Sequence, residues 1–392
     1  MPPPRRIRSI LDGGASGWEI VYAARDLQAK GERVTMLTIG EHENPTPAPI
    51  LDAMDASARA GRTGYSPVMG SLGLREAIAA RASRRAGAPV APDEVVVAAG
   101  GQAALFQALC AVIDPGDAVV AIDPLYTTYP GTIRAAGGIP RIVPARAEDG
   151  FQPDLAALDI ACAGARALLV NSPNNPTGAV YSAASIAGLA ELARRHDLWL
   201  ISDEVYDGMA WDQPHLSPRA LPGMAERTVI IGSLSKSHAM TGSRIGWAAA
   251  PAEIAALIVD LALNANYGLP RFIQDAGEWA LREGDAIEDD LRAAFRARRD
   301  LARAALSQRP GLRLSPPQGG MYVMPDIRAT GLDARTFAER LLEEERIAVM
   351  PGESFGDAAS GHVRIALTVT EPELADALDR LAGFADRLAA AR

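Results

Sequence analysis

TVIIGSLSKSHAMTGSRIGW, residues 228–247, begins with an apolar run and continues into small hydroxyl residues around Lys236. We expect the run to form a strand and Lys236 to follow its carboxyl end, where open α/β sheets present functional groups. A lysine amine can form an imine with a carbonyl compound, and Ser233, Ser235 and Arg244 could bind an anion beside it. A solvent-exposed lysine and an arginine in a salt bridge are the more common situation, so this segment alone does not define a site.

The same succession of elements extends on both sides of this segment, from about residue 90 to about residue 250. Short β-rich apolar runs are followed by turns of Gly, Pro, Asp or Asn and then by stretches rich in Ala and Leu. This rhythm predicts an α/β fold whose large domain has a mostly parallel seven-stranded sheet sandwiched by helices. The predicted strands are Glu94–Ala98, Ala118–Ile122, Ile139–Val143, Ala167–Asn171, Trp199–Ser202, Thr228–Gly232 and Gly246–Ala250.

The remaining segments predict a smaller domain and an N-terminal arm. A long helical stretch from about Pro251 through Ser307 is expected to link two domains, and beyond it short apolar runs alternate with helices, as in an α+β domain. We therefore predict an arm at 1–45 that packs on the small domain, a large domain at 46–275 and a small C-terminal domain at 276–392. The short runs are Gly320–Val323, Ile347–Met350 and Val363–Leu367.

Composition and charge restrict the possible partners. The formal net charge is −9 and the isoelectric point is about 5.2, so the long-range field repels nucleic acid and anionic membrane surfaces. A run of about 18 apolar residues occurs nowhere, and Asp12 and Gly13 interrupt the basic start of the chain. We therefore expect no membrane span, no signal peptide and a cytoplasmic location. Cys110 and Cys162 lack a paired ligand spacing, so no metal site is predicted.

Three further segments place polar or glycine residues directly after predicted strands. NSPNNPTGAVY, residues 171–181, has asparagines that usually bond their own backbone but could donate to a phenolic oxygen. LWLISDEVYDGMAW, residues 198–211, sets Asp203 and Glu204 where carboxylates either cap helices or bond a protonated ring nitrogen. EVVVAAGGQAALFQAL, residues 94–109, has a double glycine that lets backbone amides approach an anion, and it is neither a dinucleotide fingerprint nor a nucleotide phosphate loop.

Seven motifs occur together, in order, over nearly the whole chain. They are GYSPVMGSLGLREAIA at 64–79, AAGGQAAL at 98–105, PNNPTG at 173–178, SDEVY at 202–206, SLSKSHAMTGSRIGW at 233–247, PGESFG at 351–356 and HVRIAL at 362–367. This combination is highly specific. It resembles fold-type I enzymes that depend on pyridoxal 5'-phosphate (PLP), specifically the class I/II aminotransferases of the aspartate aminotransferase superfamily.

The resemblance implies three catalytic residues. Lys236 would form a Schiff base with PLP and then move a proton between the substrate Cα and the cofactor as general base and acid. Asp203 would bond the pyridine nitrogen and keep it protonated. Tyr206, together with Asn175, would bond the phenolic oxygen of the cofactor.

It also implies how the rest of the cofactor is bound. Tyr126 would lie against the ring face. Tyr65 looks like the tyrosine that reaches the phosphate of the neighbouring subunit, so a homodimer with shared sites is expected. The phosphate ligands implied within one chain are Gly101, Gln102, Ser233, Arg244 and, as a further addition, Ser235.

The substrate side of the site follows from the same resemblance. Arg364 would bind the α-carboxylate of an amino acid with a two-bond fork. Gly40 matches the loop position whose backbone approaches that carboxylate, and Asn175 is assigned to substrate binding as well as to the cofactor.

The chain departs from the family pattern at three places, one of which is Ser243 before Arg244, where Trp is frequent. The N-terminal loop reads GEHENPTP where GEPDFDTP is usual, with His42 and Glu43 at positions where Pro and Asp are common. We expect His42 to be a solvent-exposed loop histidine, with substrate contact as the alternative. In ALNANYGLPRFIQ, residues 262–274, Asn-Tyr-Gly replaces Thr-Ser-Asn, and the register of Arg271 does not match a known distal-carboxylate ligand.

We predict a PLP-dependent aminotransferase that moves an amino group between an L-amino acid and a 2-oxo acid with ping-pong kinetics. The alternative is a lyase on the same scaffold, such as a carbon–sulfur lyase or an aminocyclopropane-carboxylate synthase-like enzyme, because the cofactor motifs are shared. A PLP-sensing regulator is disfavoured, since the first 45 or so residues lack a helix-turn-helix pattern and the net charge is negative. The motifs leave the amino donor and the oxo acid acceptor open.

Overall fold

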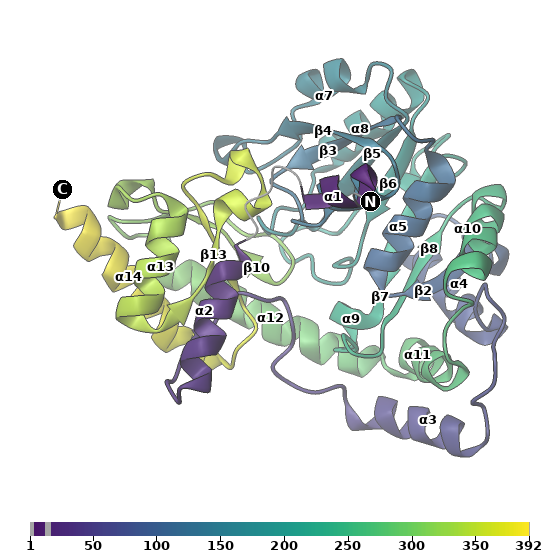
Figure 1. Cartoon of the computed structure of the whole chain (residues 1–392), viewed down its shortest axis with the longest axis horizontal. Helices are drawn as coiled ribbons and strands as arrows, with labels where there is room; N and C mark the ends of the chain where they lie inside the picture. The colour runs from purple at the N-terminus through teal and green to yellow at the C-terminus, as the bar shows by residue number, and fades with distance from the viewer. Residues whose placement is uncertain (1–3, 12–16, 392) are drawn as a thin grey trace.

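The computed structural model of the protein describes residues 4–11 and 17–391 (Figure 1). Residues 1–3, 12–16 and 392 lie outside the described residues. Parts of the predicted N-terminal arm, including Asp12 and Gly13, therefore have no structural account.

A seven-stranded sheet forms the centre of the larger part, in the order β2-β8-β7-β6-β5-β3-β4. Strands β3 to β7 run parallel, whereas β8 runs antiparallel to both β2 and β7. Every predicted strand is present within one residue of its predicted ends, which confirms the α/β class and the mostly parallel sheet. The strands are β2 Val95–Ala99, β3 Ala118–Asp123, β4 Ile139–Pro144, β5 Ala167–Asn171, β6 Trp199–Asp203, β7 Thr228–Ser233 and β8 Ile245–Ala249.

Helices cover both faces of this sheet. On one face, α5, α6 and α10 pack against strand residues such as Val96, Val119 and Ile201. On the other face, α4 and α11 pack on β2, β7 and β8, while α7 and α8 pack on β3 to β6. Because the central strands are buried on both faces, their sequences are continuous apolar runs. The helices that cover the sheet are α4 Leu72–Ala86, α5 Gly101–Val112, α6 Tyr129–Ala135, α7 Leu155–Cys162, α8 Ala183–Arg195, α10 Ala252–Ala265 and α11 Arg271–Glu283.

The helical stretch predicted from about Pro251 through Ser307 is made of three helices, α10, α11 and α12 (Asp285–Leu306). The first break lies at Tyr267 and Gly268, whose φ angles of 62° and 91° are incompatible with a right-handed helix. Pro270 then caps the start of α11. Gly284 separates α11 from α12 with a φ of −95°.

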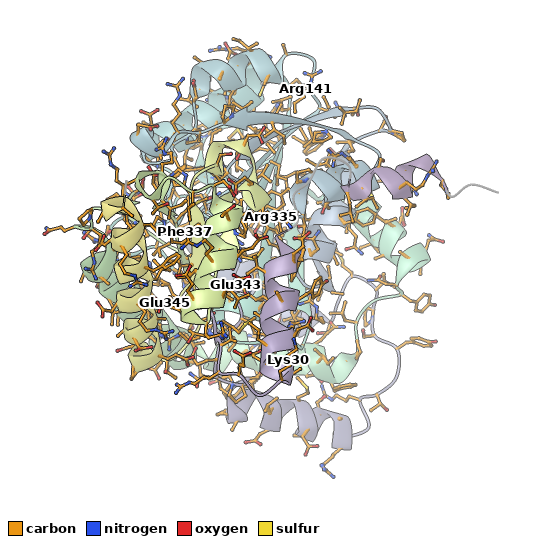
Figure 2. The ribbon with its side chains drawn as sticks, turned by 60° about the vertical axis from the view of Figure 1, so that its left-hand side comes forward. Lys30, Arg141, Arg335, Phe337, Glu343 and Glu345 are labelled. Carbon is orange, nitrogen blue, oxygen red and sulfur yellow. The ribbon has the colours of Figure 1, made fainter. Side chains whose placement is uncertain are left out.

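A smaller α+β part combines the C-terminal segment with residues 18–37 near the start of the chain. Helix α2 (Trp18–Ala29) lies beside α13 (Ala334–Glu345), as Figures 1 and 2 show. Strand β1 (Thr35–Met36) pairs in parallel with β12 (Ile347–Ala348), and Ile20 and Leu37 belong to the same apolar cluster as the C-terminal helices. The domain boundaries themselves stay predictions. The other elements of this part are β9 Arg313–Leu314, β10 Tyr322–Val323, β11 Pro325–Asp326, β13 Met350–Pro351, β14 Val363–Ala366 and α14 Glu371–Ala390.

Two helices lie apart from these layers. Helix α3 (Ala48–Arg59) packs on α11, and α1 (Arg5–Arg8) lies near α6. Within the described parts of the chain, no helix is both long enough and apolar enough to cross a membrane.

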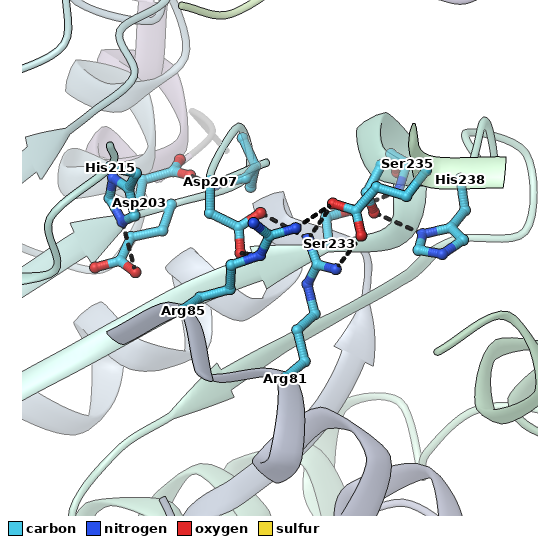
Figure 3. Close-up of polar contacts among 12 residues, drawn as sticks. Arg81, Arg85, Asp203, Asp207, His215, Ser233, Ser235 and His238 are labelled. Atoms are coloured by element: carbon cyan, nitrogen blue, oxygen red, sulfur yellow. Dashed lines mark hydrogen bonds and ion pairs between the residues drawn. The ribbon is translucent and has the colours of Figure 1, made fainter. Parts of the chain in front are cut away.

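A buried ion network joins α4, α12 and the segment that follows β6. Arg81 of α4 is 4% exposed and donates to Asp207 at 2.7 Å and to Glu288 of α12 at 2.8 Å. Arg85, one turn further along α4, adds a 2.9 Å hydrogen bond to Glu288 (Figure 3). Burial alone would raise the pKa of Glu288, but the hydrogen bonds and charge of Arg81 lower that pKa to about 2. The network therefore fixes the chain just after Asp203.

We expect Arg81→Met to lower the free energy of unfolding by about 3–5 kcal/mol, because Asp207 and Glu288 would stay buried with only the partly exposed Arg85 as counter-charge. Arg59→Met is the control, since Arg59 pairs with Asp55 on the surface, with side chains 79% and 61% exposed. The control should lose much less stability, because an exposed ion pair contributes little. Urea unfolding followed by circular dichroism measures both variants, and equal losses would contradict this account of the network.

Candidate active site

A cavity of about 420 Å³ lies at the carboxyl ends of the central strands, where parallel sheets place their sites. Residues from the N-terminal loop, the strand ends and the C-terminal part line it together. Every site residue predicted from the sequence except Tyr65 is part of this lining. These residues are Gly40, Gly101, Gln102, Tyr126, Asn175, Asp203, Tyr206, Ser233, Ser235, Lys236, Arg244 and Arg364.

Lys236 lies on α9 (Leu234–Ser237), a helix of four residues that begins directly after β7. Ser233 caps this helix, because its Oγ accepts a hydrogen bond from the Ser235 amide at 3.0 Å. The half-buried Lys236 donates from its Nζ to the carbonyl oxygen of Gly40 in the N-terminal loop. Lys236 is thus a lysine whose amine reaches a cavity, and not a residue of the outer surface.

Asp203, the last residue of β6, is 7% exposed and lines the same cavity. Its Oδ2 accepts a hydrogen bond of 2.6 Å from the Tyr129 hydroxyl, and its Oδ1 accepts one of 3.3 Å from the Val205 amide. Burial raises the pKa of Asp203 to about 6, against these hydrogen bonds, which lower it. The carboxylate is therefore desolvated but ionised at neutral pH.

Arg364 of β14 is 5% exposed and lines the cavity. It donates to Asn175 Oδ1 at 3.0 Å and to the carbonyl oxygen of Thr38. Its guanidinium carbon lies 4.4 Å from the ring centres of both Tyr322 and Phe355. Burial lowers the pKa of Arg364, and its Nε has no hydrogen-bond partner among the described residues. A buried cation with an unpaired N–H fits an anionic ligand group.

Tyr206 forms a hydroxyl pair with Tyr322 of β10. Their oxygens are 3.2 Å apart, and burial raises the pKa of Tyr206. Gly40 leaves room for this pair, because a Cβ on Gly40 would lie 1.8 Å from the Tyr322 hydroxyl. The predicted loop glycine is therefore required by a close approach.

A second cationic corner is formed by Arg244 and the start of α5. Arg244 has a φ of 54° and donates to the carbonyl oxygens of Thr241 and Ala99 at 2.9 and 3.3 Å. A Cβ on Gly100 would lie 2.4 Å from Arg244 Nη2, so only glycine admits the guanidinium there. The amides of Gly101 and Gln102 begin α5, have no acceptor within the helix and lie at the positive end of the helix dipole. This corner can bind a phosphate-like anion.

Tyr65 lies outside the cavity of its own chain. It is 92% exposed and contacts Tyr267 edge to face, with ring centres 5.2 Å apart. Arg271 lies in the same surface region, where Arg62 and Arg271 line a hollow with Tyr65. Arg271 donates to Asp275 at 2.6 Å, one turn along α11. The predicted contact of Tyr65 with a neighbouring subunit stays a prediction.

The expectation that His42 is solvent-exposed is wrong. His42 is 8% exposed, lies edge to face with Phe295 at 5.1 Å and is bonded to the Lys236 backbone. Burial lowers the pKa of His42 to about 4. Its neighbour Glu43 pairs with Arg298 of α12, which explains why the loop folds inward.

Sequence reasoning missed three aromatic residues that shape the cavity. Tyr129 bonds Asp203, and Tyr322 and Phe355 enclose Arg364. Phe355 lies inside the motif PGESFG, and Tyr129 lies three residues after the predicted Tyr126, so closeness to a predicted site residue or motif was the available signal. Tyr322 had no such signal beyond a short apolar run.

This arrangement combines an amine, a buried carboxylate, four phenols and two guanidinium groups around one cavity. An amine can bond a carbonyl carbon, and the carboxylate can keep a ring nitrogen protonated. The two cationic corners suit a ligand set with two anionic groups.

Comparisons with known proteins agree with this chemistry. A family model described as aminotransferase class I and II matches residues 32–381. An arginine–pyruvate transaminase of Pseudomonas aeruginosa is 45% identical over 376 residues, which cover 95% of each chain. An aspartate/prephenate aminotransferase of Thermus thermophilus is 38% identical over 364 residues, covering 92% of this chain and 93% of that protein.

A solved structure of aspartate aminotransferase from Thermus thermophilus with maleate has the same fold. It superposes with a TM-score of 0.92 at 35% identity and covers 99% of this chain and 100% of that chain. The fold-type I class predicted from the motifs is thereby confirmed. The chain belongs to the class I and II aminotransferases, a PLP-dependent family.

Proposed function

We propose that the cavity of this aminotransferase binds PLP, with Lys236 bonded to the aldehyde carbon of the cofactor. Four observations support it. Lys236 presents its amine to the cavity, and Asp203 presents a desolvated carboxylate. The glycine at position 100 leaves space for Arg244 beside the amides of α5, and Tyr206 offers a hydroxyl.

When bound, PLP supplies an electron-accepting ring and carries the amino group between two substrates. Asp203 would present its carboxylate to the ring nitrogen while Tyr129 keeps that carboxylate oriented. Lys236, once its amine is free, would take a proton from the substrate Cα and pass it to the cofactor. Arg364 would hold the α-carboxylate through the fork that Asn175 and the Thr38 carbonyl already orient.

Transamination is favoured over the lyase alternative, because the relatives are named transaminases or aminotransferases.

We infer a cationic amino acid such as arginine as donor, with a 2-oxo acid as acceptor. Among the described residues that line the cavity, the basic side chains are Lys236, Arg244 and Arg364, each with a proposed role. Glu41 is an exposed carboxylate in the same lining and is held by Thr241 at 2.9 Å. The arginine–pyruvate transaminase supports this donor class.

We also infer a homodimer in which Tyr65 serves the site of the neighbouring subunit. Tyr65 and Tyr267 are 92% and 53% exposed, and their mutual contact leaves an aromatic surface that an interface would bury. A cytoplasmic location stays a prediction from composition.

Lys236→Ala tests the cofactor assignment. The variant should lose the visible absorbance change that PLP gives with the parent protein. Among the described residues that line the cavity, Lys236 is the only lysine that could bond the cofactor. Gel filtration and circular dichroism should match the parent. An unchanged absorbance spectrum in Lys236→Ala would overturn the assignment.

PLP affinity should depend on the protonation of Asp203. Its pKa of about 6 means that the cofactor-free site holds a carboxylate above this pH and a neutral acid below it. We expect the dissociation constant of PLP to rise about tenfold between about pH 7.5 and about pH 5, as the carboxylate fraction falls. Equilibrium binding to the cofactor-free protein measures this.

Asp203→Asn should bind PLP more weakly and show a flatter pH profile. Asp123→Asn is a matched control, because burial also raises the pKa of Asp123 to about 6 but the residue does not line the proposed PLP cavity. The control should keep the profile of the parent. A parent-like profile in Asp203→Asn would show that another group titrates.

The donor class can be tested with L-arginine and L-citrulline, which have similar shape but differ in charge. Single-turnover loss of the cofactor absorbance should be faster with arginine. Glu41→Gln should reduce the arginine-to-citrulline rate ratio by about two- to fivefold, the range for an exposed charge pair. Equal rates for both donors in the parent would contradict a cationic donor while leaving the PLP assignment intact.

A further inference from the structure

The carbonyl oxygen of Lys236 lies at the end of a very short helix. Helix α9 has four residues and ends at Ser237, and Ala239 follows with a φ of 51°. Carbonyls in the last turn of a helix lack helical donors. His42 Nε2 lies 2.9 Å from the Lys236 oxygen and supplies a donor. An imidazole from a loop 194 residues away thus completes the turn that carries the lysine.

The imidazole of His42 is itself fixed. Because its pKa is lowered by burial, the ring is neutral at neutral pH and has one N–H, which must be on Nε2 to face a carbonyl oxygen. The ring lies edge to face with Phe295, and Arg298 lies 5.2 Å from the centre of that same Phe295 ring. Arg298 also donates to Glu43 and to the Leu367 carbonyl oxygen at 3.2 Å. The ring is therefore held by packing on α12 and by an ion pair at the next residue.

The loop that carries His42 contacts Lys236 both at its backbone oxygen and at its side-chain amine. Gly40, two residues earlier, accepts the hydrogen bond from Lys236 Nζ. Two more carbonyl oxygens of this loop accept hydrogen bonds. The Thr38 oxygen accepts one from Arg364, and the Ile39 oxygen accepts one from the Thr368 hydroxyl at 3.0 Å. A continuous segment, residues 38–42, thus runs from the arginine proposed to bind substrate to the lysine proposed to move the proton.

We propose that His42 is a positioning residue for Lys236. It fixes the Lys236 backbone through the carbonyl oxygen and so determines how far the lysine amine reaches relative to the 38–42 segment. The proposal rests on the proposed function of Lys236. Proton transfer depends steeply on the position of the base, so release of this carbonyl should slow the chemical step more than it weakens substrate binding.

His42→Phe keeps an aromatic ring against Phe295 but removes the donor, whereas His42→Gln keeps an N–H at a similar reach. We expect His42→Phe to lower kcat by about tenfold, with KM for the amino donor within about twofold of the parent. The pH midpoint of the bound-cofactor absorbance should shift by about half a unit or more. His42→Gln should recover most of both. His42→Met replaces the Phe variant if circular dichroism shows that the latter is not folded.

Thr46→Val is the matched control. Thr46 Oγ1 donates to the Ala239 carbonyl oxygen at 2.7 Å, so it connects the same loop to the same turn without touching Lys236. This variant should keep the kcat and the pH midpoint of the parent. Equal effects in Thr46→Val and His42→Phe would overturn the proposal, because loop attachment alone would then explain both. An unchanged pH midpoint and kcat in the folded donor-free variant would also overturn it. Failure of the parent protein to give a cofactor absorbance would instead reject the proposed function.

Discussion

The side chain of Asn171 connects the ends of two neighbouring strands, and the rest of the site depends on this connection. Its Nδ2 donates to the Asp203 carbonyl oxygen at 2.9 Å, and its Oδ1 accepts from the Asn175 amide at 2.9 Å. Asn171 and Asp203 are also opposite one another in the β5–β6 register. Asn175 in turn accepts from Arg364. One buried amide thus sets the separation between the carboxylate proposed for the cofactor ring and the arginine proposed for substrate.

The sheet could be predicted because its strands carry their own signal. Central strands of a parallel sheet are buried on both faces, so each is an apolar run bounded by turn residues, as in Ala167–Asn171. The antiparallel direction of β8 could not be predicted, since direction depends on which neighbours a strand pairs with. The break at Tyr267 was missed for a related reason. A positive φ at a non-glycine residue is imposed by surroundings and not by residue type.

The candidate site also has residues that the sequence could place and residues that it could not. Residues at strand ends, such as Asp203 and Ser233, could be placed around one cavity from the sequence because parallel strands end at the same edge. Their roles came from the family resemblance. His42 was misjudged because its partners, the Lys236 carbonyl and Phe295, are about 200 or more residues away in the chain, and a single sequence gives no distance between them. Loop composition predicts solvent exposure, whereas long-range packing decided otherwise.

Arg364 shows why the cavity favours an anion before any substrate arrives. Its guanidinium is buried between Tyr322 and Phe355, and among the described residues no carboxylate forms a salt bridge with it. Unpaired buried charge is costly, and the lowered pKa of Arg364 reflects that cost. This free-energy cost is part of folding and not of ligand binding, because Asn175 and the Thr38 carbonyl already hold the guanidinium in place. A carboxylate that enters the cavity then meets a desolvated, oriented counter-charge without further reorganisation of the protein. Because the Thr38 carbonyl that holds Arg364 belongs to the segment 38–42, the carboxylate-binding arginine and His42 are attached to the same stretch of chain.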